Sequence, residues 1–462
     1  MRRQIPRLGV PAVRRCREPK TDCLEISCSA TKLTSPDGIR SAPVAWRGRR
    51  AFDRSFWAAA TCATAALVAS GLARADDAVL VPDLGTGCPA LVVLGVQGTS
   101  ESSPAADPRA LTGMIGQVFA PMLGSDPGIG AFTIPYDASF GGVWGTGADT
   151  TTFAASSTRA EDRLGAAAAR VVAECPHTQL GVVGFSQGAG AAAGFARAVG
   201  DGIGPVDADH VAGVALLSDW TRSPGGQIPG RPGQTTPDPA PGTAGTEVSG
   251  ISLPPVPSTG GIVSDAADFG DLSGRVGQYC AAGDLACDFP DHAAVVQAVA
   301  GIAAQADLGD PVSAVSSLTA VATATAARAG TAAILDDVQL GADGSVDYVP
   351  AESFCRRLAD AADPRDPGPA PEAETRAASD KAAQVAAAIA ADPLGQIPRL
   401  VGELGAAVAA NIADNADLAD PAVLSRAAGV VADHTGYGRD GTAAAAGDWF
   451  DAIAHDLEGD GR

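Results

Sequence analysis

The stretch that decides the fold is GVVGFSQGAG, residues 181–190. Apolar residues run into Gly184-Phe185-Ser186-Gln187-Gly188, a G-x-S-x-G sequence between a predicted strand and a predicted helix. Glycines are needed there because the serine lies on a strained turn where larger neighbours would clash. The pattern predicts an exposed Ser186 hydroxyl at the turn. It also places the backbone N–H of Gln187, at the helix N-terminus, where it can stabilise an oxyanion.

The sequence around this turn alternates apolar runs with helical patterns between residues 90 and 220. Predicted strands cover 90–97, 131–138, 179–185 and 210–219, and predicted helices cover 107–123, 158–174 and 187–200. Thr158-Arg159-Ala160-Glu161 has the form of a capping box and is taken as the start of its helix. This alternation predicts an α/β fold with a mostly parallel central sheet flanked by helices.

The alternation stops after residue 220. Residues 223–261 contain 9 Gly and 9 Pro in 39 positions, a composition that predicts a long surface loop inserted in the α/β domain. From Ala293 onward the chain is rich in alanine with helical spacing. We therefore expect an α/β domain over 76–300 and an all-α C-terminal region over 301–462.

The N-terminal part of the chain has the layout of a secretory signal. Basic residues precede an apolar run from Trp57 to about Leu72, and Ala73-Arg74-Ala75 follows as an A-x-A cleavage site. We predict a signal peptide over 44–75 and a non-native or disordered extension over 1–43. Arg49-Arg50 resembles a twin-arginine element, so the export route stays open. The mature protein is expected to be secreted, in contact with the cell envelope or free, and to have no stable transmembrane span.

The charge of the chain narrows the choice of partners. Residues 76–462 hold 18 Lys and Arg against 48 Asp and Glu, a formal charge of −30. Such a surface repels phosphate backbones, so nucleic acid is not an expected partner. The sequence contains no H-E-x-x-H, no P-loop lysine and no dinucleotide-binding fingerprint. No metal and no organic cofactor is predicted.

The predicted export determines which cysteines remain and how they are expected to react. Cleavage after Ala75 leaves five of them, Cys88, Cys175, Cys280, Cys287 and Cys355. In an oxidising compartment these are candidates for disulfide bonds rather than metal ligands. Because the number is odd, at least one thiol stays unpaired.

A nucleophilic serine needs a base and an acid that orients it. His292 lies eight residues after Asp284, and Asp284 lies between Cys280 and Cys287. A disulfide closing that short loop would hold the carboxylate in place. His177 and His210 lie at the starts of predicted strands, on the edge opposite the nucleophile turn, and are interpreted as structural or solvated.

Two alternatives stay open for the acid and the base. Asp219, which ends a predicted strand after the nucleophile helix, is an alternative acid. His434, within the stretch DHTGYG, could return from the C-terminal region as the base.

Four features together resemble the cutinase family of serine esterases. They are Cys88-Pro89 before the first strand, Gly98-Thr99-Ser100-Glu101 after it, Cys175-Pro176 before the strand into the G-x-S-x-G turn, and a Cys-x-x-Gly-Asp-x-x-Cys loop followed by a histidine. The resemblance covers about residues 85–300. It implies an α/β-hydrolase fold with Ser186 as nucleophile, Asp284 as acid and His292 as base.

The resemblance also implies the disulfide pairs and the oxyanion hole. It pairs Cys88 with Cys175 and Cys280 with Cys287, and it assigns the oxyanion hole to the backbone N–H groups of Thr99 and Gln187. Cys355 is then the unpaired thiol, expected to be buried in a helix and inert.

The function expected from these residues is hydrolysis of carboxylic esters by a secreted serine esterase acting on lipid or polyester substrates. Four aromatic residues are candidates for an acyl groove, namely Phe140, Trp144, Phe153 and Trp220. The alternative is an envelope-binding protein that keeps the hydrolase fold without catalysis. A third reading makes the helical region a lid over the pocket. Acyl chain length, natural substrate and oligomeric state are not predicted.

Overall fold

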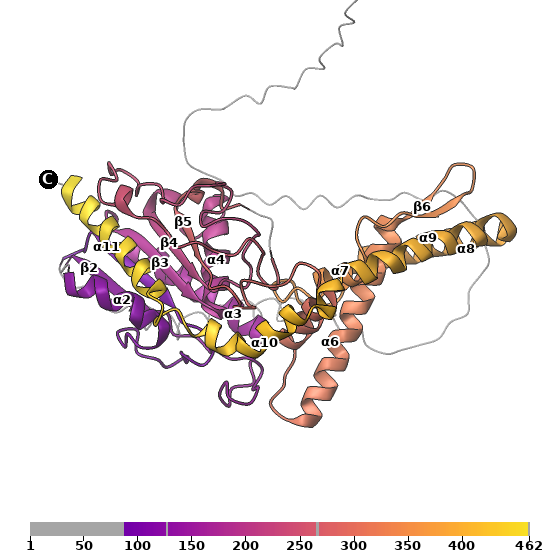
Figure 1. The fold of residues 1–462 in the computed structure, drawn as a ribbon, viewed down its shortest axis with the longest axis horizontal. Coiled ribbons are helices and arrows are strands. Elements are labelled where there is room, and N and C mark those ends of the chain that lie inside the picture. Colours follow the sequence, from indigo (N-terminus) through magenta and orange to yellow (C-terminus); the bar gives the residue numbers. More distant parts are fainter. Residues whose placement is uncertain (1–86, 126–127, 265–267, 461–462) are drawn as a thin grey trace, which may run out of the picture. The chain divides into compact units, whose positions relative to one another are not determined.

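The computed structural model describes residues 87–125, 128–264 and 268–460 (Figure 1). All of them belong to one compact unit of the chain. The predicted extension over 1–43 and the predicted signal peptide over 44–75 lie outside the described residues, so both stay predictions.

The centre of the described region is a five-stranded parallel sheet with the order β2-β1-β3-β4-β5 (Figure 1). The strands are β1 (Leu91–Val96), β2 (Ile129–Thr133), β3 (Gln179–Phe185), β4 (Val211–Leu217) and β5 (Val276–Tyr279). Because the strands are parallel, the loops after β1, β3, β4 and β5 all leave from one edge of the sheet. Every candidate catalytic residue on those loops is thereby brought to the same edge.

Helices cover both faces of the sheet. One apolar cluster joins it to α3 (Phe153–Glu174) and α4 (Gln187–Gly200), and a second joins it to α2 (Gly113–Ser125) and α11 (Thr442–Asp460). Strand β1 supplies both clusters, because Val92 and Leu94 face one side while Leu91 and Val93 face the other. Strands buried on both faces read as continuous apolar runs, which is how β1 and β3 were recognised.

The last helix of the chain, α11, completes this domain. Its Trp449 and Phe450 are fully buried and lie close to the sheet glycines Gly213 and Gly181. A Cβ atom added to Gly181 would lie 2.9 Å from the Phe450 ring, so the strand can carry no side chain there. The α/β domain therefore includes residues beyond the predicted boundary at 300.

Most predicted elements are found close to their expected positions, and two begin elsewhere. Strand β3 and helix α4 have the predicted bounds. Helix α3 begins at Phe153, five residues before the predicted capping box, because the Thr152 side chain accepts a hydrogen bond from the N–H of Ala155 and caps it. Helix α2 begins at Gly113 rather than 107.

The Pro- and Gly-rich stretch 223–261 is a long loop, as predicted. Among its described residues, the loop contains one turn of 3₁₀-helix, η2 (Val248–Gly250). Two further 3₁₀ turns, η1 (Ala208–His210) and η3 (Gly270–Leu272), lie before and after the loop. The buried guanidinium of Arg222 holds the loop, donating to the carbonyls of Pro257 and Thr259 and, at 2.9 Å, to that of Cys287. One side chain thus ties the loop to the disulfide loop beside it.

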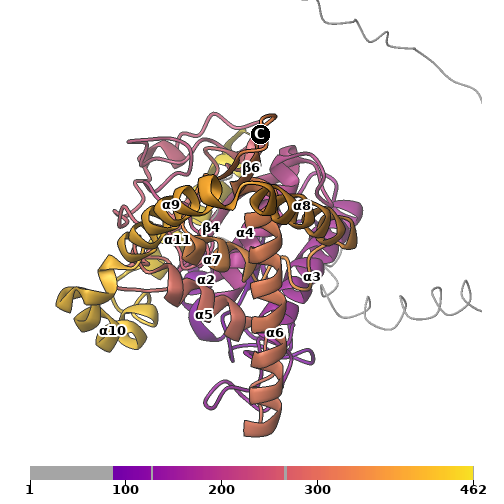
Figure 2. The same ribbon diagram turned by 90° about the vertical axis from the view of Figure 1, so that its right-hand side faces the viewer.

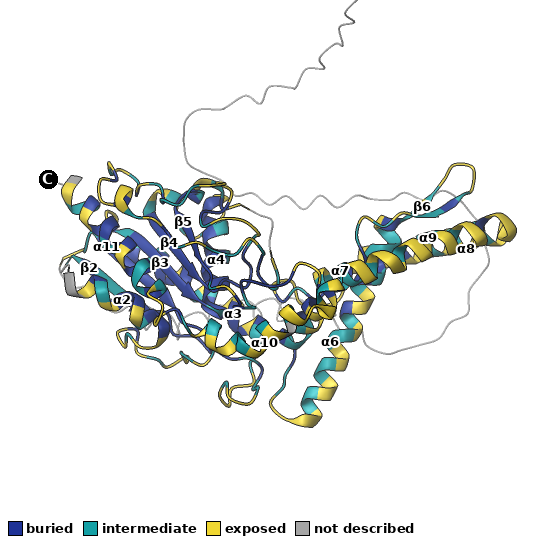
Figure 3. Ribbon diagram, in the orientation of Figure 1, coloured by how far each residue is buried: buried dark blue, intermediate teal, exposed yellow. Residues whose placement is uncertain are grey.

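Residues 294–434 are helical, as expected, with one addition. They form α5 (Ala294–Ala304), α6 (Pro311–Ala332), η4 (Ala333–Asp337), α7 (Phe354–Ala361), α8 (Glu372–Ala391), α9 (Pro393–Ala413), η5 (Ala416–Ala419) and α10 (Pro421–His434). The addition is an antiparallel hairpin of β6 (Val338–Leu340) and β7 (Val346–Tyr348). Helix α7 packs against α5 and α6 (Figure 2). These helices carry more exposed residues than the sheet (Figure 3).

The two ends of this helical segment are bound to each other. The N–H of His292 donates to the Asp417 carboxylate (3.0 Å), and the N–H of Asp417 donates back to the His292 carbonyl (3.1 Å). Next to them, Val295 N–H donates to the Asn415 side chain (2.9 Å). Residues 296–413 therefore leave and rejoin the domain at one place. They are an insertion within the α/β domain rather than a region that follows it.

Two disulfides are present, Cys88–Cys175 and Cys280–Cys287, the pairs that the resemblance implied. Cys355, on α7, is unpaired and half-buried, so the expected full burial is not found. Among the described residues one helical stretch, Pro311–Asp337, is long and apolar enough (mean hydropathy 1.3) to cross a membrane by length and composition alone.

Candidate active site

Ser186 lies at the sharp turn between β3 and α4, as predicted. Its backbone has φ 54° and ψ −119°, a conformation that residues other than glycine rarely adopt. The glycines beside it are required for packing: a Cβ atom on Gly188 would lie 2.2 Å from the Val96 carbonyl oxygen, and one on Gly184 would lie 2.4 Å from the Gly188 carbonyl oxygen. The turn is closed so tightly that the Ser186 side chain is left half-exposed at the edge of the sheet.

The imidazole beside Ser186 belongs to His434. Its Nε2 atom lies 2.9 Å from the Ser186 Oγ, and its Nδ1 atom lies 2.9 Å from Oδ1 of Asp284. His434 is the last residue of α10, and its ring packs on Phe185 with the ring centroids 5.3 Å apart. The three side chains form a hydrogen-bonded chain in the order serine, histidine, aspartate.

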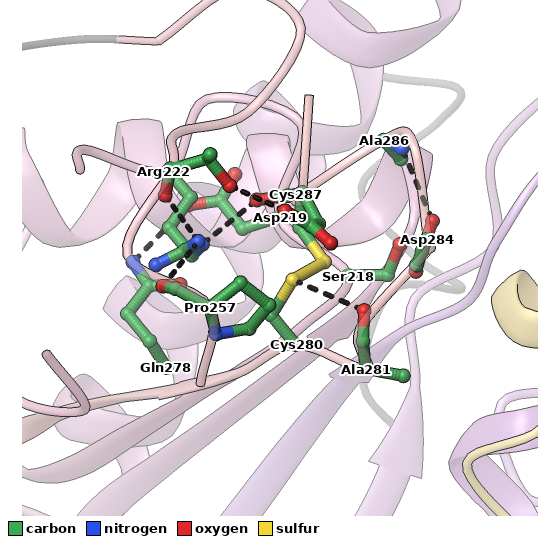
Figure 4. The surroundings of a disulfide bond; sticks show 12 residues. Ser218, Asp219, Arg222, Pro257, Gln278, Cys280, Ala281, Asp284, Ala286 and Cys287 are labelled. Carbon is green, nitrogen blue, oxygen red and sulfur yellow. Dashed lines mark hydrogen bonds between the residues drawn. A yellow bond between two sulfur atoms is a disulfide. The ribbon is translucent and has the colours of Figure 1, made fainter. Parts of the chain in front are cut away.

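Asp284 is held by the Cys280–Cys287 loop and is fully buried (Figure 4). Besides His434, it accepts hydrogen bonds from the N–H of Ala286 (3.1 Å) and from the hydroxyl of Tyr437 (2.7 Å). Both carboxylate oxygens therefore have partners, which a buried carboxylate requires.

These partners decide the charge of the acid. Burial by itself raises the pKa of Asp284, but hydrogen bonds from His434, Ser218 and Tyr437, together with the charge of His434, bring that pKa below its ordinary value. Asp284 is therefore ionised throughout the neutral range and can orient and stabilise the imidazole.

We expect Asp284 to stabilise the fold in a pH-dependent way. Because its pKa is lower in the folded state than its ordinary 3.8, its contribution is complete above that value and disappears as the pH falls below it. Urea unfolding of the wild type and of Asp284→Asn, measured from pH 7 to pH 3, should show a stability advantage of the wild type that shrinks in the most acidic samples. An advantage that grows toward pH 3 would contradict this assignment.

His292 is not brought to Ser186. Its side chain is exposed just before α5, and its backbone is bound to Asp417 at the base of the insertion. The expectation that His292 completes the triad is therefore wrong. The histidine beside Asp284 is His434, which follows the insertion in the chain.

Asp219, the alternative acid, is also directed elsewhere. It is fully buried after β4, and its Oδ1 accepts from the N–H (2.9 Å) and the hydroxyl (2.8 Å) of Thr221. Its role is to close the turn after β4, while Asp284 faces the imidazole. Of the other two histidines considered, His177 is exposed and His210 is half-buried at the start of β4.

The candidate oxyanion hole lies on the neighbouring loop. A Cβ atom added to Gly98 would lie 3.3 Å from the Ser186 Cβ, so the backbone before Thr99 passes directly beside the nucleophile. The carboxylate of Glu101 holds this loop, accepting from the N–H groups of Gly98 and Met114 (both 3.1 Å). Gln187 begins α4, where helix N–H groups have no partner within the helix. Both amides remain candidates for the role.

Three of the four predicted groove aromatics form one row. The ring centroids of Phe140 and Phe153 are 5.1 Å apart, and those of Phe153 and Trp220 are 5.3 Å apart. The Phe153 carbonyl accepts a hydrogen bond from the Gln187 side chain (3.2 Å), which links the row to the nucleophile turn. Trp144 is 99% exposed and is not part of this row.

Two residues of the site were not predicted from the sequence. Tyr437 is in the DHTGYG stretch that also holds His434, so that stretch contained a signal for both. Ser218, directly after β4, has its Oγ 3.0 Å from Nδ1 of His434, and nothing in its local sequence indicates this. Among the described residues, no group of three or more His, Cys, Asp or Glu side chains could hold a metal.

The comparisons with known proteins concern the part of the chain that holds Ser186 and Asp284. Residues 87–305 match the cutinase family model. A carboxylesterase Culp6 homolog from Corynebacterium glutamicum is 33% identical over 216 residues, which are 44% of this chain and 66% of that relative, slightly less than two thirds of its length.

Two solved structures are similar to this chain at lower sequence identity. The catalytic core domain of an acetyl xylan esterase from Trichoderma reesei is 20% identical, with 51% of this chain and 99% of that chain covered and a TM-score of 0.33. A cutinase-like protein from Cryptococcus sp. is 18% identical, with 44% and 84% covered and a TM-score of 0.28.

The family match ends at residue 305, within the described segment and before His434. The match therefore ends inside the inserted segment, and His434 lies outside it. The sheet topology, the two disulfides, the family match and the curated relative lead to one conclusion. Residues 87–305, slightly less than half of the chain, are similar to the cutinase family, and the stretch shared with the curated relative is similar to a carboxylesterase homolog.

Proposed function

We propose that this protein is a secreted serine esterase that hydrolyses carboxylic esters through an acyl-enzyme on Ser186, with His434 as base and Asp284 as acid. The observation that supports it is the chain of hydrogen bonds from Ser186 to His434 to Asp284, both 2.9 Å. Secretion is supported by the signal-like sequence over 44–75 and by two disulfides, which form in oxidising compartments.

The mechanism follows from these positions. Ser186 Oγ attacks the ester carbonyl carbon while His434 Nε2 takes its proton, and Asp284 stabilises the imidazolium that forms. The N–H groups of Thr99 and Gln187 stabilise the oxyanion. The intermediate collapses, and the departing alcohol takes the proton from His434. Water then attacks the acyl-enzyme in the same way, releasing the carboxylic acid and restoring Ser186.

The aromatic row suggests an apolar acyl group as substrate. Phe140 and Phe153 are half-buried residues whose rings pack on each other, and the backbone of Phe153 is bonded to the Gln187 side chain. A fatty acyl chain or an apolar polyester segment would gain from contact with these rings.

A fluorophosphonate probe and a series of p-nitrophenyl esters test this function. We expect the purified protein to react with the probe at Ser186, identified by peptide mass spectrometry, and to hydrolyse esters from C2 to C18. Phe153→Ala should reduce kcat/KM for the longer esters by about tenfold and leave acetate hydrolysis nearly unchanged. A protein that neither reacts with the probe nor hydrolyses any ester would instead be a binding protein with a hydrolase fold.

The disulfide that contributes more to stability should contribute less to activity. Cys88 and Cys175 are 87 positions apart, whereas Cys280 and Cys287 are 7 apart. Loop entropy predicts that replacing the first pair with alanine costs about 4.5 kcal/mol of unfolding free energy, and the second about 2–3 kcal/mol. Only the second pair holds Asp284. We therefore expect the smaller stability loss to accompany the larger drop in kcat, measured by urea unfolding and ester hydrolysis. Equal effects of both replacements on kcat would contradict this.

A further inference from the structure

The residue after β4 has an unusual backbone conformation for its type. Ser218 has φ 57°, one of four positive values among the described residues other than glycine. Glycine adopts this conformation freely, whereas a side chain makes it unfavourable. Ser218 is also fully buried, so solvent does not compensate. A strained backbone at a serine suggests that its hydroxyl has a use there.

The hydroxyl of Ser218 lies on the side of the imidazole away from Ser186. Its Oγ is 3.0 Å from His434 Nδ1, the nitrogen that also faces Asp284. A hydroxyl can accept one hydrogen bond and donate another. Here it can accept from the Nδ1–H and donate to the carboxylate, and its hydrogen bond contributes to the lowered pKa of Asp284. Figure 4 shows Ser218 beside Asp284.

The Oδ2 atom of Asp284 is held by Tyr437. Its buried hydroxyl donates to Oδ2 of Asp284 (2.7 Å) and accepts from the N–H of Ala281 (3.0 Å). Ala281 belongs to the disulfide loop, and Tyr437 is three residues from His434. The carboxylate is thus held by the Tyr437 hydroxyl and the Ala286 N–H, and the Ser218 hydroxyl lies beside both the acid and the imidazole.

We propose that Ser218 is a positioning residue for the triad, which rests on the proposed esterase function. Its hydroxyl and the Asp284 carboxylate share the Nδ1–H of His434, and the imidazole keeps the tautomer whose unprotonated Nε2 faces Ser186. A ring turned by half a rotation would lose both acceptors at once. Ser218 touches neither substrate nor Ser186 in this scheme, so it acts through His434.

Two substitutions separate the hydroxyl from the backbone. Ser218→Ala removes the hydroxyl and keeps the strain, whereas Ser218→Gly removes the hydroxyl and relieves the strain. We expect both variants to lower kcat by about five- to twentyfold with KM changed less than twofold, because a hydrogen bond to the base is lost. The Tm of Ser218→Gly should equal or exceed that of Ser218→Ala.

Ala138→Gly is the matched control for the backbone. Ala138 also has a positive φ of 48° and carries no hydroxyl. Its replacement should change Tm and leave kcat at the wild-type value. If Ser218→Gly also has wild-type kcat, the hydroxyl has no catalytic use and the inference is overturned.

Histidine tautomers provide a readout that does not depend on turnover. In protein labelled with ¹⁵N-histidine, the signals of His434, identified by their loss in His434→Ala, should report an Nδ1–H tautomer in the wild type and a mixture in Ser218→Ala. An unchanged tautomer overturns the inference. Absence of probe labelling and of ester hydrolysis in the wild type would instead refute the proposed function, and the tautomer measurement would still decide the role of Ser218.

Discussion

Replacing His434 with alanine is expected to lower kcat for p-nitrophenyl esters by about 10⁴-fold or more, since removal of a triad base has effects of this size. The physical reason is that Ser186 loses the one imidazole placed to take its proton, with Nε2 at 2.9 Å. Without it the hydroxyl stays protonated at neutral pH and is a weak nucleophile.

His292→Ala is the matched control for this result. His292 is the histidine nearest to Asp284 in sequence, but its side chain is exposed and its contacts with Asp417 are made by its backbone, which alanine keeps. We therefore expect kcat within twofold of the wild type. A large loss of activity in His292→Ala together with an active His434→Ala would reverse the assignment of the base. Measuring Tm for both variants separates catalysis from folding.

The parts of the fold that were predicted well carry strong local signals. Strand β3 is a continuous apolar run, and helix α4 begins at the glycine-framed serine, so both bounds could be read from the sequence. The start of α3 could not, because two threonines six residues apart can each cap a helix. Thr152 caps it in the structure, whereas Thr158 bonds back to the carbonyl of Ala154 from inside the helix.

The site was predicted in part for the same reason. Ser186 and Asp284 lie in short motifs whose geometry is local, a tight turn and a disulfide loop. The base is defined by a contact across 248 positions, and the insertion that separates it from the acid leaves no local mark at His292. Proximity in sequence favoured His292. In the structure, however, the hydrogen bonds between His292 and Asp417 fix the backbone of His292 at the start of the insertion.

The insertion also explains why the domain boundary could not be placed. Alanine-rich helices look alike in sequence whether they follow a domain or interrupt it. What distinguishes α11 is the pair Trp449 and Phe450, which are fully buried against sheet glycines. The two aromatic residues are visible in the sequence. The sequence does not show which surface they pack against.

Ser186→Ala is the second substitution expected to have a very large effect. Removing the nucleophile abolishes the acyl-enzyme route, and the remaining groups, an ordered imidazole and the two candidate oxyanion amides, can only assist direct attack by water. We expect kcat to fall by about 10⁴- to 10⁶-fold, as for other serine hydrolases that lose one member of the triad.

The stability of this variant should change little. Alanine keeps the strained φ of 54°, so the backbone gains nothing, while the hydrogen bond to His434 is lost at a half-exposed position. The two effects predict a change in unfolding free energy of less than about 1 kcal/mol. Ser186→Gly relieves the strain and should be more stable than Ser186→Ala by about 1 kcal/mol, yet equally inactive. Residual turnover of more than a few per cent in both variants, confirmed with independently purified protein, would mean that another residue attacks the ester.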